Sequence, residues 1–352
     1  MSILRSIHKF YISIRYAFRL HKPVLTLRLI NILLDVHFFK KKPLRYVDFA
    51  LGYKCNLTCQ HCFATVLEDK NRKIMSPDDY KRVVKESMEL GAVNFSIQGG
   101  EPLLYRNLRD IIQALKPEQN VISVTTNGVL LTAEKVKELK MWGVDILTVS
   151  LDSGIEDEHD DFRGKKGIFE KTLNGIKEAL KQGLHVTIGT TVYHGNIKSE
   201  GIRKICDLAK DLKCVLCFNL AVPIGNWDKN EEVLLTENDL EYLKVIVNKS
   251  PYIRTDFEAN IGGYGCGSVK EILYITPYGD VLPCPFIHIS LGNVLNEPVK
   301  MIRERALKNK YFKSYYQTCL CATDKEFIKN CLSKTRGVSP LPIPAEEVFE
   351  NE

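Results

Sequence analysis

The sequence lacks both a long hydrophobic run and a secretion signal. No window of its 352 residues holds about eighteen uninterrupted apolar residues, so a conventional transmembrane helix is not expected. No short apolar core is followed by a small-residue cleavage site, and no repeat with a period of about 20 to 50 residues is visible. Hydrophobic residues make up 45% and charged residues 26%, which excludes a disordered chain. We therefore expect a globular protein of the reducing cytoplasm.

Acidic residues are scarce in one region, the amino terminus. Residues 1–45 hold ten Lys or Arg and a single acid, Asp35, whereas the rest of the chain holds 39 basic and 42 acidic residues. The overall charge of +6 is thus a basic arm of +9 attached to a body of −3. A nucleic-acid-binding protein carries its basic stripe on the fold itself, so this distribution argues against that class.

Cysteine is abundant, and its count is odd. Eleven cysteines do not suit a closed disulfide framework, and in a cytosolic protein they indicate metal or cluster ligation. They fall into three groups, which are Cys55, Cys59 and Cys62; Cys206, Cys214 and Cys217; and Cys266, Cys284, Cys319, Cys321 and Cys331. We predict two metal-binding regions, one early and one late.

The hydrophobic pattern predicts an α/β fold. Short β-branched runs alternate with amphipathic helical stretches, and the expected strands are 46–51, 93–98, 121–126, 146–151, 185–192 and 215–220. One helix is well marked, by Ser76 as N-cap, Pro77 in its first turn and Gly91 as its stop. Six βα units in succession predict a parallel sheet with right-handed crossovers, and hence a partial (β/α)6 TIM-like barrel open along one side.

A small carboxy-terminal α+β domain is expected after the barrel. Segments 271–275 and 280–282 flank Pro277, Tyr278 and Gly279, which predicts a hairpin, and a helix is expected over about 299–307. From residue 338 the chain holds three prolines and four glutamates, so a loosely ordered tail is expected.

The pattern Cys55-x-x-x-Cys59-x-x-Cys62 follows the first strand, at the rim where barrel enzymes carry catalytic groups. Three thiolates on one loop can hold one iron–sulfur cluster and leave one of its four irons open to another ligand. A structural zinc site is the alternative, but it usually requires a nearby fourth ligand. His61 is available, although its position next to Cys62 makes joint ligation awkward.

This triplet resembles the signature of the radical S-adenosylmethionine (SAM) enzymes, and the resemblance extends from residue 45 to about residue 331. It implies a 4Fe–4S cluster on the triplet and SAM beside it. Gly99-Gly100-Glu101-Pro102 looks like the family motif that binds the methionine amino group of SAM. Glycines permit close approach of backbone to a ligand, and a carboxylate complements an ammonium group.

Further SAM contacts are implied by the same resemblance. Asn127 follows strand three, and Ser150 and Asp152 resemble the residues that contact the ribose. Arg163 resembles an arginine that holds the SAM carboxylate in relatives with auxiliary clusters. His61 departs from the family, because an aromatic residue usually stacks near adenine at that position.

The late cysteines resemble the auxiliary-cluster domain of SPASM and twitch radical enzymes. Cys266, then Gly279 and Cys284, match its opening hairpin, and the short later run fits the twitch form with one auxiliary cluster. The resemblance implies Cys319 as the third ligand and favours Cys321 over Cys331 as the fourth. The predicted segments are an arm over 1–44, a barrel over 45–258, an auxiliary domain over 259–335 and a flexible acidic tail over 336–352.

The mid-chain cysteines are expected to be core thiols, since free cysteine behaves as a small hydrophobe. The alternative for Cys217 is that it faces the barrel lumen and donates a hydrogen atom to a substrate radical, as in radical epimerases.

The resemblance implies that SAM is cleaved reductively and that the resulting 5′-deoxyadenosyl radical abstracts hydrogen from substrate. It also implies a reducing partner such as ferredoxin or flavodoxin. Maturation of a ribosomal peptide is favoured, and radical oxidation or epimerisation of a sugar, cyclitol or lipid is the alternative. A non-catalytic iron–sulfur protein is the competing class.

Two interpretations of the arm stay open. An apolar helical stripe and a second apolar stretch over 25–39, interspersed with basic residues, suit an amphipathic helix at the anionic inner face of the membrane. The same pattern suits a helical pair packed over the outside or bottom of the barrel. The stripe consists of Ile3, Ile7, Phe10, Ile14 and Phe18.

Overall fold

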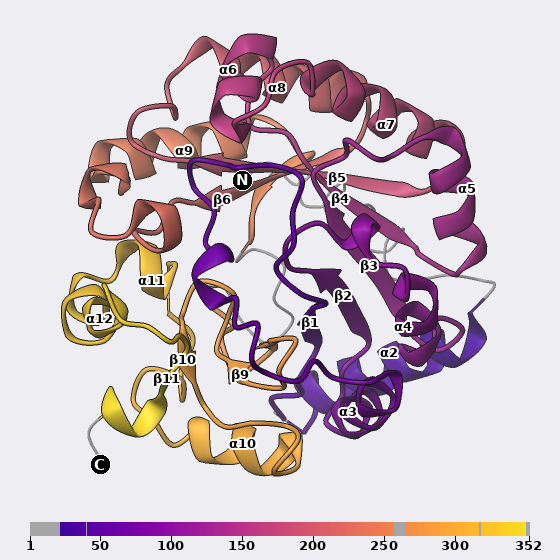
Figure 1. Cartoon of the computed structure of the whole chain (residues 1–352), viewed down its shortest axis with the longest axis vertical. Coiled ribbons are helices and arrows are strands. Elements are labelled where there is room, and N and C mark those ends of the chain that lie inside the picture. Colours follow the sequence, from indigo (N-terminus) through magenta and orange to yellow (C-terminus); the bar gives the residue numbers. More distant parts are fainter. Residues whose placement is uncertain (1–21, 40, 257–264, 317, 350–352) are drawn as a thin grey trace.

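The structure is a computed structural model that describes residues 22–39, 41–256, 265–316 and 318–349. The six predicted parallel strands are confirmed and follow one another in order around a curved sheet (Figure 1). They are β1 (Tyr46–Ala50), β2 (Asn94–Gln98), β3 (Val121–Thr126), β4 (Ile146–Ser150), β5 (His185–Val192) and β6 (Val215–Leu220). The partial-barrel prediction is therefore confirmed.

Three further strands extend the sheet at its two edges. β7 (Ile253–Thr255) pairs in parallel with β6, and β8 (Ile272–Ile275) pairs in parallel with β1. β9 (Val281–Leu282) pairs antiparallel with β8, which confirms the predicted hairpin. Because β8 joins the main sheet, the hairpin is continuous with the barrel. The proposed boundary after residue 258 falls within 257–264, outside the described residues, and it stays a prediction.

Helices cover the outer face of the sheet (Figure 1). The predicted ends of the helix that follows β1, α3, are confirmed. Ser76 and Asp79 form a reciprocal capping box, and Gly91 after the helix adopts φ +104°. The helices of the barrel are α3 (Pro77–Glu89), α4 (Leu108–Ala114), α5 (Ala133–Met141), α6 (Glu156–Arg163), α7 (Phe169–Lys181), α8 (Glu200–Asp211) and α9 (Glu237–Lys249).

The carboxy-terminal part packs beside the open side of the barrel. It contains β10 (Ile289–Ser290), α10 (Val299–Ala306), α11 (Leu320–Thr323), α12 (Lys325–Asn330) and β11 (Ile343–Pro344). The expectation of a flexible tail over 336–352 is wrong for residues 336–349. β11 pairs in parallel with β10, and Leu341, Ile343 and Val348 are buried, so apolar residues between the prolines fix this segment.

Helix α2 (Pro23–His37) closes the amino-terminal end of the barrel. Its residues Leu25 and Ile32 are buried against Val93 and Val121, at the starts of the strands. This helix of the arm therefore packs under the barrel, as one of the two interpretations expected. The proposed stripe from Ile3 to Phe18 lies outside the described residues. No helix in the described part of the chain is long and apolar enough to cross a bilayer.

Candidate active site

Both predicted cysteine regions line one cavity of about 670 Å³. The cavity occupies the barrel lumen and its mouth, at the carboxyl ends of the parallel strands, and continues down to Leu29 of α2. The lining includes Cys55, Cys59, Cys62, Cys266, Cys284, Cys319 and Cys321. Both groups of thiols therefore open onto the same cavity.

The cysteine triplet lies on the loop after β1, and neighbouring loops fix that loop. Asn226 donates from Nδ2 to the Cys59 carbonyl (2.8 Å) and from its backbone N–H to the Cys62 carbonyl (2.9 Å). Burial raises the pKa of the Cys55 and Cys59 thiols above the usual range, so metal binding must displace protons from them.

Gly99 and Gly100 bring the loop after β2 against the cysteine loop. The Gly100 N–H donates to the Gly52 carbonyl (2.8 Å), and the Glu101 N–H donates to the Lys54 carbonyl (2.9 Å). Gly99 adopts φ +127°, and a Cβ at either glycine would collide with these backbone atoms. Both glycines line the cavity, so a ligand can reach their backbone. The predicted contact of this backbone with SAM stays a prediction.

Glu101 is fully buried and is satisfied by the protein itself. Its carboxylate accepts hydrogen bonds from Thr126 Oγ1 (2.7 Å), the Asn127 N–H (2.8 Å) and the Leu103 N–H (3.1 Å). Neither Glu101 nor the buried Pro102 lines the cavity. In this conformation Glu101 positions the loop that carries Asn127, and its predicted contact with the SAM amino group stays a prediction.

Arg163 and Asp152 form a buried ion pair, with Arg163 Nε 2.6 Å from Asp152 Oδ2. Although burial opposes ionisation, Arg163 lowers the pKa of Asp152. Arg163 Nη1 also lies 3.7 Å from Cys59 Sγ and lines the cavity, whereas Asp152 does not. Asn127, Ser150 and Arg163 are thus the members of this predicted set that line the cavity, and their contacts with SAM stay predictions.

His61 lies in an aromatic cluster at the cavity wall. Its ring stacks on Phe162 with centroids 4.6 Å apart and planes 9° apart, and Trp227 packs beside both rings. Burial, together with the nearby Arg163 charge, lowers the pKa of His61 to about 3, so the imidazole is neutral. Phe162 covers one face of the His61 ring. Stacking of adenine on the opposite face stays a prediction.

Four of the five late cysteines line the cavity, namely Cys266, Cys284, Cys319 and Cys321. Cys319 Sγ and Cys321 Sγ lie 3.5 Å apart, and contacts with Cys284 and Cys319, with burial, raise the pKa of Cys321 well above its usual range. Cys331 is buried beside Tyr311 and does not line the cavity. The geometry favours Cys321 over Cys331 as the fourth auxiliary ligand.

These donor sets fit iron–sulfur clusters. Among the described residues no three His, Cys, Asp or Glu side chains converge as ligands of a single metal ion. The thiols instead face shared open space, and all-thiolate sets are typical of iron–sulfur clusters. Cys55, Cys59 and Cys62 would hold the cluster that supplies one-electron cleavage chemistry, and the other four would hold the auxiliary cluster.

Three lumen residues were not predicted from the sequence. Asp48 of β1 is buried at the cavity wall, and burial raises its pKa to about 7, partly offset by Ser96, Gln98 and Tyr46. Arg254 of β7 lines the same cavity, and its Nε atom is buried without a hydrogen-bond partner among the described residues. Asn219 of β6 adds an amide. The sequence feature that could have indicated Asp48 is its position as an acid between apolar residues of strand β1.

Comparison with known families identifies this site. The family model described as "Radical SAM superfamily" matches residues 50–209, and the SPASM model, described as "Iron-sulfur cluster-binding domain", matches residues 266–331. The chain belongs to the radical SAM superfamily. It is therefore an enzyme that uses SAM, a 4Fe–4S cluster and an auxiliary iron–sulfur cluster, and the non-catalytic alternative is set aside.

Several relatives of this radical SAM enzyme are similar over most of its length. The AdoMet-dependent heme synthase of Methanosarcina barkeri is 28% identical over 291 residues, which cover 74% of this chain and 82% of that protein. The antilisterial bacteriocin subtilosin biosynthesis protein AlbA of Bacillus subtilis is 25% identical over 283 residues. The aligned residues cover 76% of this chain and 61% of AlbA.

A solved structure shares the fold. Streptococcus suis SuiB, in its complex with precursor peptide SuiA, superimposes with a TM-score of 0.60 and 16% identity. The superposition covers 81% of this chain and 70% of SuiB. At this identity the likeness shows the fold alone.

Proposed function

We propose that this radical SAM enzyme modifies a ribosomally made peptide in the reducing cytoplasm, with electrons from a ferredoxin or flavodoxin. The observation that carries the proposal is the single cavity shared by Cys55, Cys59 and Cys62 and by the late cysteines. A substrate held there lies in the same space as the radical site and the auxiliary thiols. The similarity to AlbA, a bacteriocin biosynthesis protein, supports a peptide substrate.

The size of the cavity limits how such a peptide binds. Sites for one small ligand commonly occupy about 300–1,000 Å³, so SAM alone takes a large share of this one. Because the two clusters also occupy part of this space, we expect only one side chain or a short segment of the peptide to enter the lumen, with the rest at the mouth. His61 lines the cavity, and its ring belongs to a cluster with the rings of Phe162, Tyr193 and Trp227.

A small polar substrate is the second candidate, and the lumen residues favour it. Asp48, Arg254 and Asn219 offer a carboxyl, a guanidinium and an amide to a bound molecule. Radical oxidation or epimerisation of a sugar or cyclitol would use such groups. Cys217, buried on β6 and lining the cavity, is the proposed hydrogen donor for epimerisation.

The test is anaerobic reconstitution of the full chain with iron and sulfide, followed by reduction and addition of SAM. Release of 5′-deoxyadenosine is measured in three arms: without added substrate, with short peptides encoded beside the gene, and with a pool of sugars and cyclitols. We expect a peptide to stimulate release and to change mass. Stimulation by the polar pool alone would favour the second candidate, and no release in any arm would overturn the proposed activity.

The matched control uses the cysteines of the same chain. Joint substitution of Cys55, Cys59 and Cys62 by Ala is expected to abolish release, because no thiolates remain to hold the active cluster. Cys206→Ala removes a thiol that does not line the cavity and is expected to retain it.

A further inference from the structure

The turn between Cys266 and strand β8 has an unusual backbone conformation. Val269 adopts φ +65°, which a β-branched residue rarely adopts, and its side chain is fully buried. Hydrogen bonds hold the turn, because the Lys270 N–H donates to the Ser268 carbonyl (2.7 Å) and Arg303 Nε donates to the Val269 carbonyl (3.0 Å). Strained backbone persists where its surroundings hold it, and it is concentrated at functional sites.

The turn brings the Ser268 hydroxyl against the Cys266 sulfur. Ser268 Oγ lies 2.9 Å from Cys266 Sγ, and Ser268 is 3% exposed. Among the described residues, this sulfur is the one hydrogen-bond partner of the hydroxyl. A neutral thiol is a weak acceptor, whereas a thiolate accepts a charge-assisted hydrogen bond that is roughly twice as strong. The contact therefore stabilises the chain most when Cys266 is deprotonated.

Cluster binding fixes the direction of this hydrogen bond. A cysteine that ligates iron has lost its proton, so Cys266 can only accept and Ser268 must donate. Burial, together with the neighbouring Cys319 and Cys284 thiols, raises the pKa of Cys266 to about 11, and hydrogen bonds from the Ser268 side chain and backbone oppose that rise. Ser268 thus favours the charged form of the sulfur, which is the form that binds iron.

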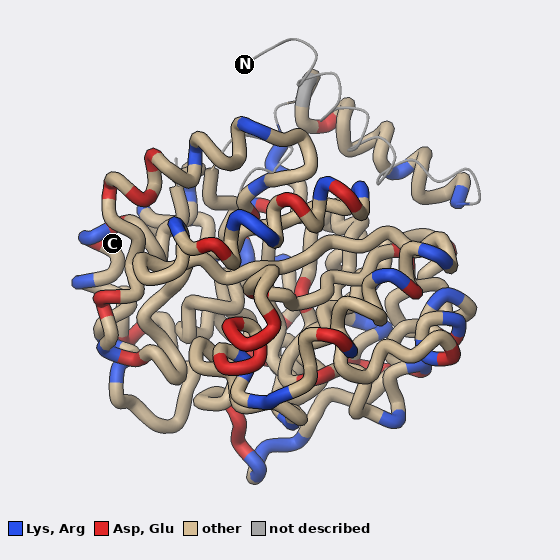
Figure 2. The backbone as a smooth tube through the Cα atoms, turned by 90° about the horizontal axis from the view of Figure 1, so that it is seen from above, with Lys and Arg blue, Asp and Glu red and all other residues tan. Residues whose placement is uncertain are grey.

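A buried lysine holds the backbone of Ser268 in place. Charged positions of both signs are spread along the helices and loops of the body (Figure 2), but Lys270 is buried, at 1% exposure. Lys270 Nζ donates to the Ser268 carbonyl (3.2 Å) and to the Phe312 carbonyl (3.1 Å), and it lies 5.5 Å from the centre of the Tyr315 ring. The turn is therefore anchored to the segment around Phe312, which fixes the position from which the hydroxyl reaches Cys266.

We propose that the Ser268 hydroxyl donates to the Cys266 thiolate and thereby raises the reduction potential of the auxiliary cluster. One-electron reduction adds negative charge to a cluster and its sulfur ligands, so a donor at one sulfur stabilises the reduced form more than the oxidised form. Ser268 acts through Cys266 and is a positioning residue. This role requires Cys266 to be an auxiliary ligand, and it is the same whichever substrate the enzyme modifies.

The experiment is a redox titration of the auxiliary cluster in the full chain. Cys55, Cys59 and Cys62 are changed to Ala in every sample, so that the auxiliary cluster alone is titrated. After anaerobic reconstitution with iron and sulfide, titanium(III) citrate is added in steps, and the reduced cluster is measured by electron paramagnetic resonance. Neither SAM nor peptide is added, so the measurement does not depend on the proposed reaction.

Three variants on this background separate an effect on the potential from an effect on packing. Ser268→Ala is expected to lower the equilibrium constant for one-electron reduction about three- to tenfold, or ~30–60 mV. Ser268→Thr keeps the hydroxyl and is expected to stay close to the reference. Ser87→Ala is the matched control and is expected to leave the potential unchanged, because Ser87 of α3 is fully buried and its Oγ has no hydrogen-bond partner among the described residues. A purely structural role of Ser268 would lower the iron content without moving the potential of the clusters that remain.

A second measurement needs no substitution of Ser268. Electron–nuclear double resonance of the reduced cluster in H₂O and in D₂O is expected to show an exchangeable proton coupled to it, since the hydroxyl proton lies on a ligand sulfur. Absence of that coupling would overturn the proposal.

Other results would overturn it as well. They are an unchanged or higher potential in Ser268→Ala, and an equal fall in Ser268→Ala and Ser87→Ala. A background chain that holds no iron would also contradict it, because Cys266 would then ligate no cluster. Failure to release 5′-deoxyadenosine with any peptide would overturn the proposed reaction and leave the potentials as measured, so the two proposals fail separately.

Discussion

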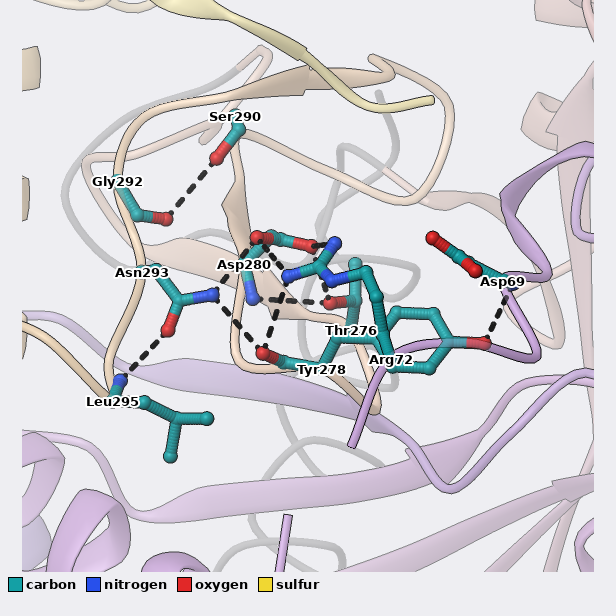
Figure 3. Close-up of polar contacts among 9 residues, drawn as sticks. All are labelled: Asp69, Arg72, Thr276, Tyr278, Asp280, Ser290, Gly292, Asn293 and Leu295. Atoms are coloured by element: carbon teal, nitrogen blue, oxygen red, sulfur yellow. Dashed lines mark hydrogen bonds and ion pairs between the residues drawn. The ribbon is translucent and has the colours of Figure 1, made fainter. Parts of the chain in front are cut away.

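Arg72 and Asp280 join the cysteine-bearing connection after β1 to the hairpin that carries Cys284. The guanidinium meets both carboxylate oxygens, with Nη1–Oδ2 at 2.6 Å and Nη2–Oδ1 at 2.9 Å, and lies 4.8 Å from the centre of the Tyr278 ring (Figure 3). Asn293 and Thr276 also donate to the Asp280 carboxylate. The two cluster regions are thus linked by side chains as well as by the sheet.

This link predicts a measurable loss on substitution. Arg72→Gln removes a bidentate pair and leaves the buried Asp280 with fewer donors, so we expect about 1–2 kcal/mol less unfolding free energy of the cluster-free chain in urea. Lys81→Gln breaks the exposed pair with Asp78 and is expected to cost less than about 0.5 kcal/mol. Equal losses in the two variants would contradict a special role for Arg72.

The auxiliary ligand set predicts iron contents. Two four-iron clusters require about eight irons per chain in the reconstituted enzyme, and about four remain when Cys55, Cys59 and Cys62 are changed to Ala. Cys321→Ser is expected to lose auxiliary iron, whereas Cys331→Ser keeps the full content because its thiol lies outside the cavity. Iron analysis and the absorbance of the clusters measure this. Loss of iron in Cys331→Ser alone would reverse the assignment.

The barrel and the cysteine triplet could be predicted because their signals are local. Each strand from β1 to β6 is a short apolar run bounded by a helix, and the triplet lies within eight residues. The sheet edges could not be predicted in the same way. β7 spans only three residues, and β8 pairs with β1 from more than two hundred residues away in the sequence.

The roles of the buried carboxylates depend on partners that no local pattern specifies. Glu101 is held by Thr126 and Asn127 from β3 and its loop, and Asp152 by Thr191 from β5. A motif shows that a carboxylate follows a strand end but not whether it faces the cavity or the neighbouring loop. The tail was misjudged for a related reason, because Leu341 and Ile343 matter more than the prolines and glutamates around them.

The hydrogen bonds that the buried Glu101 carboxylate accepts predict that its substitution affects both the fold and the SAM site. Glu101→Gln replaces one accepting oxygen with an NH₂ group facing protein donors, so we expect a loss of about 2 kcal/mol in urea unfolding. Displacement of the Asn127 loop is also expected to weaken SAM binding to the reconstituted enzyme, measured by calorimetry. Glu134→Gln, in the exposed first turn of α5, is the control and is expected to change neither quantity. Unchanged stability in Glu101→Gln would show that its hydrogen bonds are dispensable.

Asp48 predicts how the stability of the cluster-free chain depends on pH. Burial raises the pKa of this carboxyl from 3.8 to about 7, so the folded chain binds a proton that the unfolded chain releases between those values. The unfolding free energy contributed by Asp48 is therefore fully present below about pH 4 and is lost as the pH rises towards 7, with an upper bound of about 4 kcal/mol. Asp48→Asn removes this titration, so its stability is expected to fall less over the interval than that of the wild type. Urea unfolding at several pH values measures the difference. Parallel pH profiles for the two proteins would contradict a buried, protonated Asp48, because the loss would then come from other groups.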